Sequence, residues 1–355
     1  MTHAYAEELR VAEIAVQRAT LLTKKVFQEK VKGAISKDDK SPVTIGDFGA
    51  QALIIHALKK TFPEDEIVGE EEASVLRENG DLRSQIWDLV QGARLDDDQA
   101  EAILGGPVRS VDDLLDSIDA GNSTGGSKGR IWALDPIDGT KGFLRGGQYA
   151  VCLALIVNGD VKVGVLGCPN LPVDDSVTLS ADAGEGQTGD EGRGVLFAAV
   201  QGQGATRRPL GRAGLQPNQA ISVSKVTDIT DATFCESVEA AHSSHDDQFV
   251  IAKSLGVTKP SVRMDSQAKY GSLARGAGDI YLRLPVRQDY QEKIWDHAAG
   301  DLIVREAGGQ VTDALGKRLD FGKGRTLAEN KGVVAAPRQI HGQVLDAVID
   351  VLGRK

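Results

Sequence analysis

The feature that most constrains the fold is an Asn-Gly pair at residues 158–159, which lies between two apolar runs. Asn and Gly accept the positive φ angles of a two-residue turn more readily than other residues, so the pair predicts a β-hairpin. Tyr149–Val157 and Val161–Gly167 are its expected strands. The first half of the chain therefore contains antiparallel sheet, together with amphipathic helices predicted over residues 5–31 and 47–62.

Strands and helices alternate along the second half of the chain. Strand patterns at 233–238, 280–284 and near 311 alternate with helical patterns at 246–255, 266–274, 295–306 and 338–352. Such alternation is typical of an α/β domain. We therefore expect an α+β domain over residues 1–205, which carries most of the metal ligands proposed below, and an α/β domain over residues 206–355.

Residues 73–128 differ from their surroundings because they are rich in Asp, Glu, Gly and Ser. Within them, the stretch 112–118 predicts one helix, capped by Ser110 and closed by Gly121. We interpret the segment as a lid-like insertion in the first domain.

Composition and charge exclude several classes of protein. A net charge of -10 and 5% aromatic residues argue against a nucleic-acid-binding protein, which needs a basic stripe or a stacking surface. Three cysteines without a Cys-x-x-Cys pair argue against a disulfide framework or structural zinc, and they fit a reducing cytoplasm. We find no signal pattern and no apolar run of membrane-spanning length, so we expect a cytoplasmic protein without membrane contact. The sequence leaves the oligomeric state open.

The segment Trp132–Thr140 is the clearest indication of a catalytic site in the sequence. An apolar strand ends at Asp135, the following proline keeps that residue extended, and Asp138 comes three residues later at a turn. Gly139 allows close approach of a ligand, and a helix starting at the next residue would leave backbone amides free for an anion. Two carboxylates beside an anion site suit a metal ion that bridges protein and phosphate. An Asp-x-x-Asp pattern by itself is more simply explained as a structural turn. The strand, proline, glycine and threonine that accompany it here favour a functional site.

Further acidic residues lie where strands end or helices begin. Glu70 and Glu71 follow a short strand, whereas Asp47 and Asp296 each begin a helix. Taken singly, solvation or a favourable charge at a helix N-terminus explains each of them. Together they are stronger evidence for a functional site, because the ends of strands and the starts of helices present ligands from a rigid scaffold.

Three motifs, in this order, resemble the signatures of the lithium-sensitive, magnesium-dependent phosphatases, the superfamily of inositol monophosphatase and fructose-1,6-bisphosphatase. They are Val68–Glu71, Asp135–Thr140 and Trp295–Gly300. Longer stretches resemble the eukaryotic 3′(2′),5′-bisphosphate nucleotidases of that superfamily: Ser41–Asp47, Lys141–Gly146, His242–Asp246, Asp265–Tyr270 and Tyr290–His297. The likeness covers nearly the whole chain except residues 73–128 and 172–194.

The resemblance implies a fold and a metal centre. The implied fold is the layered α-β-α-β-α sugar-phosphatase sandwich, an α+β half and an α/β half with the site between them. Two or three Mg²⁺ ions would be held by Glu70, Asp135, Asp138, Asp296 and the carbonyl of Ile137. Asp47 with Thr140 would orient and deprotonate the attacking water.

The resemblance also implies the substrate, a small nucleotide bisphosphate. The expected reaction converts adenosine 3′,5′-bisphosphate to AMP and phosphate, with 3′-phosphoadenylyl sulfate as a second substrate, in sulfur assimilation. The implied phosphate and nucleotide contacts are Asp138, Gly139, Thr140, His242, Ser266, Lys269 and Arg283. Two alternatives remain, an inositol phosphate phosphatase with the same metal chemistry and a noncatalytic sensor of phosphorylated metabolites. The intact carboxylates disfavour the sensor, and residues 242–283 look nucleotide-like.

Overall fold

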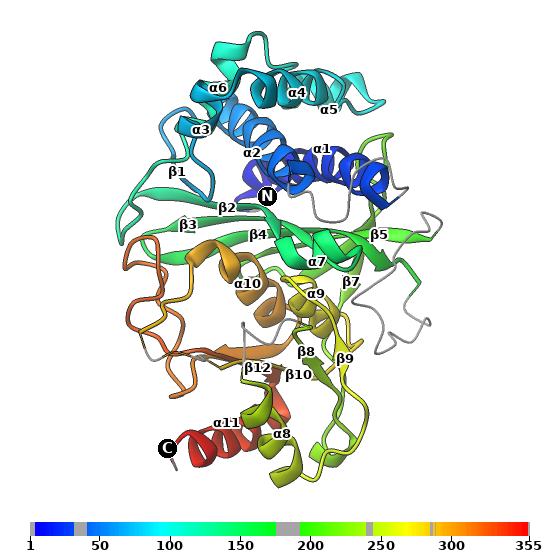
Figure 1. Cartoon of the computed structure of the whole chain (residues 1–355). Coiled ribbons are helices and arrows are strands. Elements are labelled where there is room, and N and C mark those ends of the chain that lie inside the picture. Colours follow the sequence, from blue (N-terminus) through cyan, green and yellow to red (C-terminus); the bar gives the residue numbers. More distant parts are fainter. Residues whose placement is uncertain are drawn as a thin grey trace.

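The structure is a computed structural model that describes residues 4–31, 41–174, 192–238, 244–284, 287 and 289–353. Its elements stack as helices, sheet, helices, sheet and helices (Figure 1), which confirms the layered α-β-α-β-α architecture expected from the resemblance. Each sheet is buried because helices cover both of its faces, as a layered domain requires.

The first sheet has seven strands, in the spatial order β1 to β7. Their bounds are β1 (Glu66–Gly69), β2 (Arg130–Asp138), β3 (Ala150–Val157), β4 (Asp160–Pro172), β5 (Arg193–Val200), β6 (Ala205–Pro209) and β7 (Gln219–Ile221). The first two strands pair in parallel, and the other neighbours pair antiparallel. Since β7 comes after residue 205, the sheet extends beyond the expected end of the first domain; the division into two domains stays a prediction.

The Asn-Gly hairpin is confirmed. Asn158 and Gly159 have φ angles of 52° and 81°, and the turn places Val157 opposite Asp160. Along β3, successive side chains face opposite sides of the sheet. Leu153 therefore packs with the outer helices, whereas Cys152 packs with the helices between the sheets.

The outer helical layer contains more structure than the sequence suggested. It comprises α1 (Ala6–Val31), α2 (Ser41–Thr61), α3 (Ser74–Glu78), α4 (Gly80–Gln91), α5 (Asp98–Ile103) and α6 (Val111–Asp119). Residues 73–128 thus hold four helices, whereas we expected one at 112–118; that one is confirmed as α6, with Ser110 as its cap. The other three were missed because their segment is rich in polar residues, and buried residues such as Leu76 and Ile86 find their apolar neighbours only in the folded layer, in one cluster with residues of α2.

The prediction that a helix begins at Asp47 was wrong. Because α2 begins at Ser41, Asp47 lies inside the helix rather than at its start, on the side where β1 ends. A proline in the first turn is compatible with this earlier start, since the first amides of a helix have no intrahelical partner.

The second half builds the remaining layers. The inner helices are α9 (Ala268–Ala274) and α10 (Ala298–Glu306), and α7 (Thr140–Arg145) follows β2. The second sheet has the order β11 (Gly309–Thr312), β12 (Val333–Pro337), β10 (Ile280–Arg283), β8 (Phe234–Glu236) and β9 (Val262–Arg263). Outside it lie α8 (His245–Ser254) and α11 (Arg338–Leu352).

Two helix starts in this half differ from the predictions. Ser266 has a φ of 69°, which a right-handed helix cannot accommodate, so α9 begins after it rather than at it. Asp296 ends a short 3₁₀ turn, η3 (Ile294–Asp296), that precedes α10. Both departures place a polar residue at the junction of two elements, where it lies beside the first sheet.

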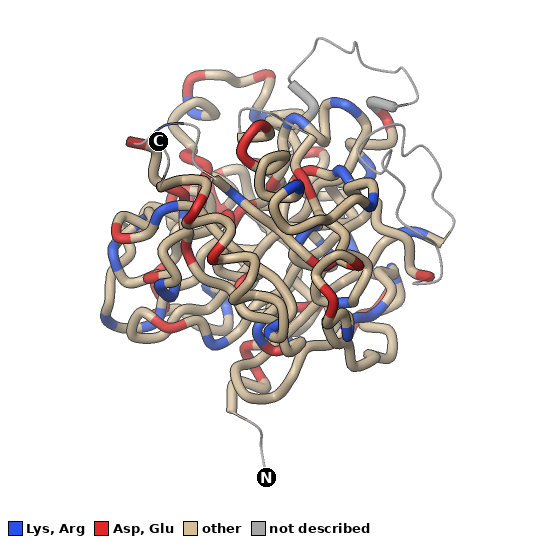
Figure 2. The backbone as a smooth tube through the Cα atoms, turned by 90° about the horizontal axis from the view of Figure 1, so that it is seen from below, with Lys and Arg blue, Asp and Glu red and all other residues tan. Residues whose placement is uncertain are grey.

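Acidic and basic positions are interspersed along the described chain (Figure 2). Among the helices that the structure describes, none combines the length and apolar character needed to cross a membrane.

Candidate active site

The site begins where β1 and β2 end. The parallel register pairs Gly69 with Leu134, so Glu70 and Asp135 follow next to each other at one edge of the sheet. Their side chains are close enough for the charge of Glu70 to act on Asp135. Gln51 of α2 fixes the chain here, since its amide bonds both the carbonyl and the amide of Glu71, at 2.7 and 3.0 Å.

A β-bulge brings Asp138 to the same face as Asp135. Two residues three apart in a regular strand would face opposite sides of the sheet. Here Asp135 pairs with Cys152 and Asp138 pairs with Ala150, so three steps along β2 match two along β3. Both partners on β3 face the inner helices, and the two carboxylates therefore do so as well.

The third aspartate comes from the second half of the chain. Carboxylate oxygens of Asp135, Asp138 and Asp296 all lie within 4.8 Å of one another. Burial, and then the charges of neighbouring carboxylates, raise the pKa of Asp135 and of Asp296 well above the usual range. Burial likewise raises the pKa of Asp138 and of Glu70.

This donor set fits a hard divalent cation. All its atoms are carboxylate oxygens, the ligands that Mg²⁺ and Ca²⁺ prefer. The raised pKa values have a single physical origin, the burial of several like charges together, and a cation between them would remove that cost. The fold therefore brings together Asp135, Asp138 and Asp296, three of the four carboxylates expected to be ligands, and Glu70 follows the strand end beside Asp135. Ile137 is buried between Asp135 and Asp138 in the chain.

A second acidic group beside this one is already compensated. Atoms of Glu292, Asp296 and His297 also lie within 4.8 Å of one another. However, Glu292 holds Arg283 through two contacts of 2.9 Å. Although burial opposes its ionisation, the hydrogen bond from His297 and the charge of Arg283 lower the pKa of Glu292 to about 2. The three aspartates are therefore the better candidates to hold a cation.

The turn after β2 is completed by the second half of the chain. Gly139 has a φ of 89°, and α7 begins at Thr140 as the sequence predicted. A β-carbon at Gly139 would lie 2.9 Å from the β-carbon of Ser266, so only glycine fits between these two chains. The backbone amide of Gln267 donates to Asp138 Oδ2 at 2.5 Å. Thr140 is exposed beside this junction.

Asp47 lies next to the carboxylate group from the side of α2. Burial, then the charges of Glu71 and Glu70, raise its pKa well above the usual range. It therefore faces the same cluster, although it comes from a different layer.

The residues expected to contact the nucleotide lie in different surroundings. Lys269 is buried, and its ammonium donates to the carbonyls of Met264 and Ser266 at 3.3 and 3.0 Å. Arg283 is engaged with Glu292 as described above. His242 lies outside the described residues. The assignment of these residues to a nucleotide stays a prediction.

Arg325 was missed by the sequence analysis, although it joins the two chain segments that carry Glu70 and Asp296, two of the expected metal ligands. Its guanidinium donates to the carbonyl of Gly69 at 2.7 Å and to that of Ser123 at 2.9 Å. It also lies over the ring of Trp295, 4.8 Å from the centroid. Gly69 precedes Glu70 and Trp295 precedes Asp296, so one side chain holds both ends. No local pattern reveals a contact between residues 256 positions apart.

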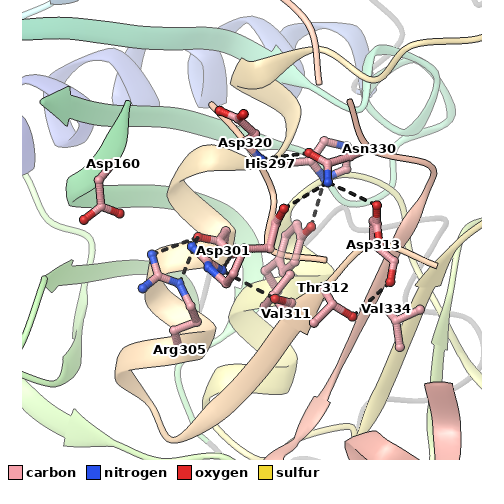
Figure 3. A network of polar contacts seen from close by, with 12 residues as sticks. Asp160, His297, Asp301, Arg305, Val311, Thr312, Asp313, Asp320, Asn330 and Val334 are labelled. Carbon is pink, nitrogen blue, oxygen red and sulfur yellow. Dashed lines mark hydrogen bonds and ion pairs between the residues drawn. The ribbon is translucent and has the colours of Figure 1, made fainter. Parts of the chain in front are cut away.

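The loop that carries Arg325 is itself fixed by a polar network between β11 and β12 (Figure 3). Asp313 accepts from two amides of the loop and from the Asn330 side chain, at 2.8 to 3.1 Å. The buried Asp301, to the left of Asp313 in Figure 3, pairs with Arg305 and Arg318 at 2.9 Å each. A loop with several charged hydrogen bonds presents Arg325 from a rigid support.

Comparisons with known proteins agree with this geometry. Residues 4–351 match the family described as Inositol monophosphatase family. A 3'(2'),5'-bisphosphate nucleotidase of Emericella nidulans is 64% identical over 348 residues, which cover 98% of this chain and 99% of that protein. The 3'(2'),5'-bisphosphate nucleotidase of Schizosaccharomyces pombe is 49% identical over 352 residues, covering 98% and 96%. An inositol monophosphatase structure from Zymomonas mobilis has a TM-score of 0.60 at 18% identity, covering 98% and 99%, and shows the shared fold.

Proposed function

The chain belongs to the inositol monophosphatase family, and from this premise we propose that it is a phosphatase that removes one phosphate from 3′(2′),5′-bisphosphate nucleotides. The observation that carries the proposal is the group of Asp135, Asp138 and Asp296, whose oxygens lie within 4.8 Å of one another and come from both halves of the chain. The names of relatives 49% to 64% identical over nearly the whole chain support the substrate class.

The proposed substrate is adenosine 3′,5′-bisphosphate, hydrolysed at the 3′-phosphate to AMP and phosphate, with 3′-phosphoadenylyl sulfate as a second substrate. This assigns the protein to sulfur assimilation, and lithium sensitivity follows from the family resemblance. A cytoplasmic location is supported by Cys152, Cys168 and Cys235, which are all buried as free thiols.

The proposed metal is Mg²⁺, in two or three ions, held by the carboxylates of Glu70, Asp135, Asp138 and Asp296 and the carbonyl of Ile137. When bound, Mg²⁺ would neutralise the phosphate oxygens, make water more acidic and stabilise the leaving oxygen. The chain supports this assignment with oxygen ligands that include the buried Asp135, and the repulsion among these carboxylates disfavours an empty site.

The remaining chemistry belongs to residues beside the carboxylates. The proposed general base is Asp47, which takes a proton at a carboxylate oxygen from the attacking water, with the Thr140 hydroxyl orienting that water. The raised pKa of Asp47 supports this role, because a more basic carboxylate accepts a proton more readily. The amides of Gly139 and Thr140 would donate to the phosphate at the start of α7. Direct attack by water needs no covalent intermediate on the protein.

The nucleotide is proposed to lie against the second half of the chain, where Ser266, Lys269 and Arg283 would contact it together with His242. Lys269 supports this role by its position, since its charge is felt by Asp138 at the metal group. Arg283 would reach a second phosphate while its pair with Glu292 keeps the guanidinium oriented.

The deciding experiment compares substrates side by side. Phosphate release from adenosine 3′,5′-bisphosphate, 3′-phosphoadenylyl sulfate and inositol phosphates would be measured with Mg²⁺ and the same protein. We expect kcat/KM to be highest for the bisphosphate nucleotides. Preference for an inositol phosphate would overturn the proposed substrate, and no turnover of any of them would favour a noncatalytic sensor.

A further inference from the structure

A second cavity lies apart from the carboxylate group. It has a volume of about 510 Å³, within the range of roughly 300–1,000 Å³ that is typical of small-molecule sites. Its walls come from the second half of α1, the end of α4 with the turn after it, the first residue of β5, and the connection between β6 and β7. None of the residues assigned above to the metal or the nucleotide lines it.

The lining of this cavity is strongly basic. Its described charged residues are all cationic, namely Lys24, Lys25, Arg94, Arg193 and Arg212. The protein as a whole has a net charge of -10, so the cluster opposes the general charge of the chain. Like charges gathered in one concave surface raise the local concentration of anions.

Two of the guanidinium groups are held in place by their neighbours. Arg193 donates to the carbonyl of Asn170 at 3.2 Å. Arg212 donates to the carbonyl of Arg94 at 3.4 Å and pairs with the exposed Asp96 at 3.2 Å. These contacts orient the cations at low further entropic cost, and Asp96 is an anionic partner of Arg212.

The cavity also has an apolar part. Leu22 is buried at its base, and Leu21, Leu89 and Leu210 are partly buried around it. A bare inorganic ion would leave these leucines in contact with water, whereas an organic group would cover them. The lining therefore suits a ligand that is anionic at one end and apolar or aromatic at the other.

We propose that this cavity binds a small organic polyanion that carries at least two phosphate or sulfate groups and an apolar or aromatic ring system. Arginine binds such groups through paired hydrogen bonds, and lysine adds a mobile point charge. The proposal concerns binding outside the metal centre, so it does not depend on which substrate the proposed function assigns.

The test is calorimetric titration of the full-length protein with ATP, in buffer without added divalent metal. The cavity variant is Lys25→Glu with Arg94→Glu, two exposed side chains whose reversal leaves the core untouched. Its matched control, Lys128→Glu with Lys317→Glu, makes the same charge change at exposed positions outside the lining. A third protein, Asp135→Asn, alters the metal group only.

We expect the wild type, the control and Asp135→Asn to bind ATP with affinities within about threefold, allowing for screened long-range charge effects. The cavity variant should bind about a hundredfold more weakly, since each lost charged hydrogen bond costs about tenfold or more. Pyrophosphate should bind more weakly than ATP, because it leaves the leucines uncovered. Equal ATP affinity in the cavity variant and the control would overturn the site, and equal affinity for pyrophosphate and ATP would overturn the organic ligand class.

Discussion

Replacing Arg325 with methionine should weaken metal binding at a site that Arg325 does not enter. The methionine keeps most of the apolar stem but removes the donors to the carbonyls of Gly69 and Ser123 and the charge over Trp295. These contacts hold the residues that precede Glu70 and Asp296. Without them, two of the four carboxylates lose the support that fixes their spacing.

The contacts that the substitution removes determine the expected losses in stability and in Mg²⁺ affinity. Each hydrogen bond from a charged donor contributes about 1.5–3 kcal/mol, and a partly exposed cation–π contact adds about 0.5–1 kcal/mol. Because Arg325 is only half-buried, we take the lower bounds and expect a loss of about 3.5 kcal/mol in the free energy of unfolding. Loss of a group that orients metal ligands typically costs tenfold to a hundredfold in affinity, so the Kd for Mg²⁺ should rise by about that factor.

Calorimetric Mg²⁺ titration and urea unfolding, run on the same preparations, would measure both quantities. Arg325→Lys should fall between wild type and Arg325→Met, since lysine keeps a charge but not the planar fork. The control is Arg338→Met, the same change at an exposed position at the start of α11, and it should alter neither quantity. If Arg325→Met lowered stability but left the Kd within twofold of wild type, Arg325 would be a structural residue only and the reasoning would be refuted.

Three further predictions concern the metal, the base and the nucleotide. A chelator should abolish phosphate release and added Mg²⁺ should restore it; full turnover in excess chelator would contradict the metal assignment. Asp135→Asn should lose Mg²⁺ affinity and activity together, whereas Asp47→Asn should lower kcat by about 10²–10⁴ and keep the tightest metal site, as calorimetry beside turnover assays would show. Burial lowers the pKa of Lys269 to about 8, so the ammonium loses its proton as pH rises above that value. The KM for the bisphosphate should therefore rise between pH 7 and 9 in the wild type but not in Lys269→Met; the same pH dependence of KM in both proteins would contradict a role for Lys269 in the nucleotide site.

Much of the fold and of the metal centre could be predicted from the sequence because the signals are local. The Asn158-Gly159 turn depends on φ angles that these two residues accept wherever they occur. Asp135 and Asp138 belong to one short motif, so the sequence places both carboxylates at the end of the same strand. The layered architecture and the ligands from distant segments came from the family resemblance, and the structure then brought those carboxylates together.

Other features depend on which residues the fold brings together. The bulge in β2 turns Asp138 to the face of Asp135, and it is visible only as a mismatch with β3. Leu76 of α3 and Ile86 of α4 are buried in one apolar cluster with residues of α2, a tertiary contribution that short-range propensity does not describe.

Arg283 shows the same limit of sequence-based prediction for a single side chain. By sequence it is a strand arginine that could meet a phosphate, but the fold places Glu292 against it at 2.9 Å. Arg325 reaches Gly69 across 256 positions of the chain. Sequence alone indicated the acidic motifs, the Asn-Gly turn and several of the strands, because these depend on neighbouring residues. The tertiary structure decided which charges face each other and what holds them, because electrostatic and hydrogen-bond energies depend on distance in space rather than on separation along the chain.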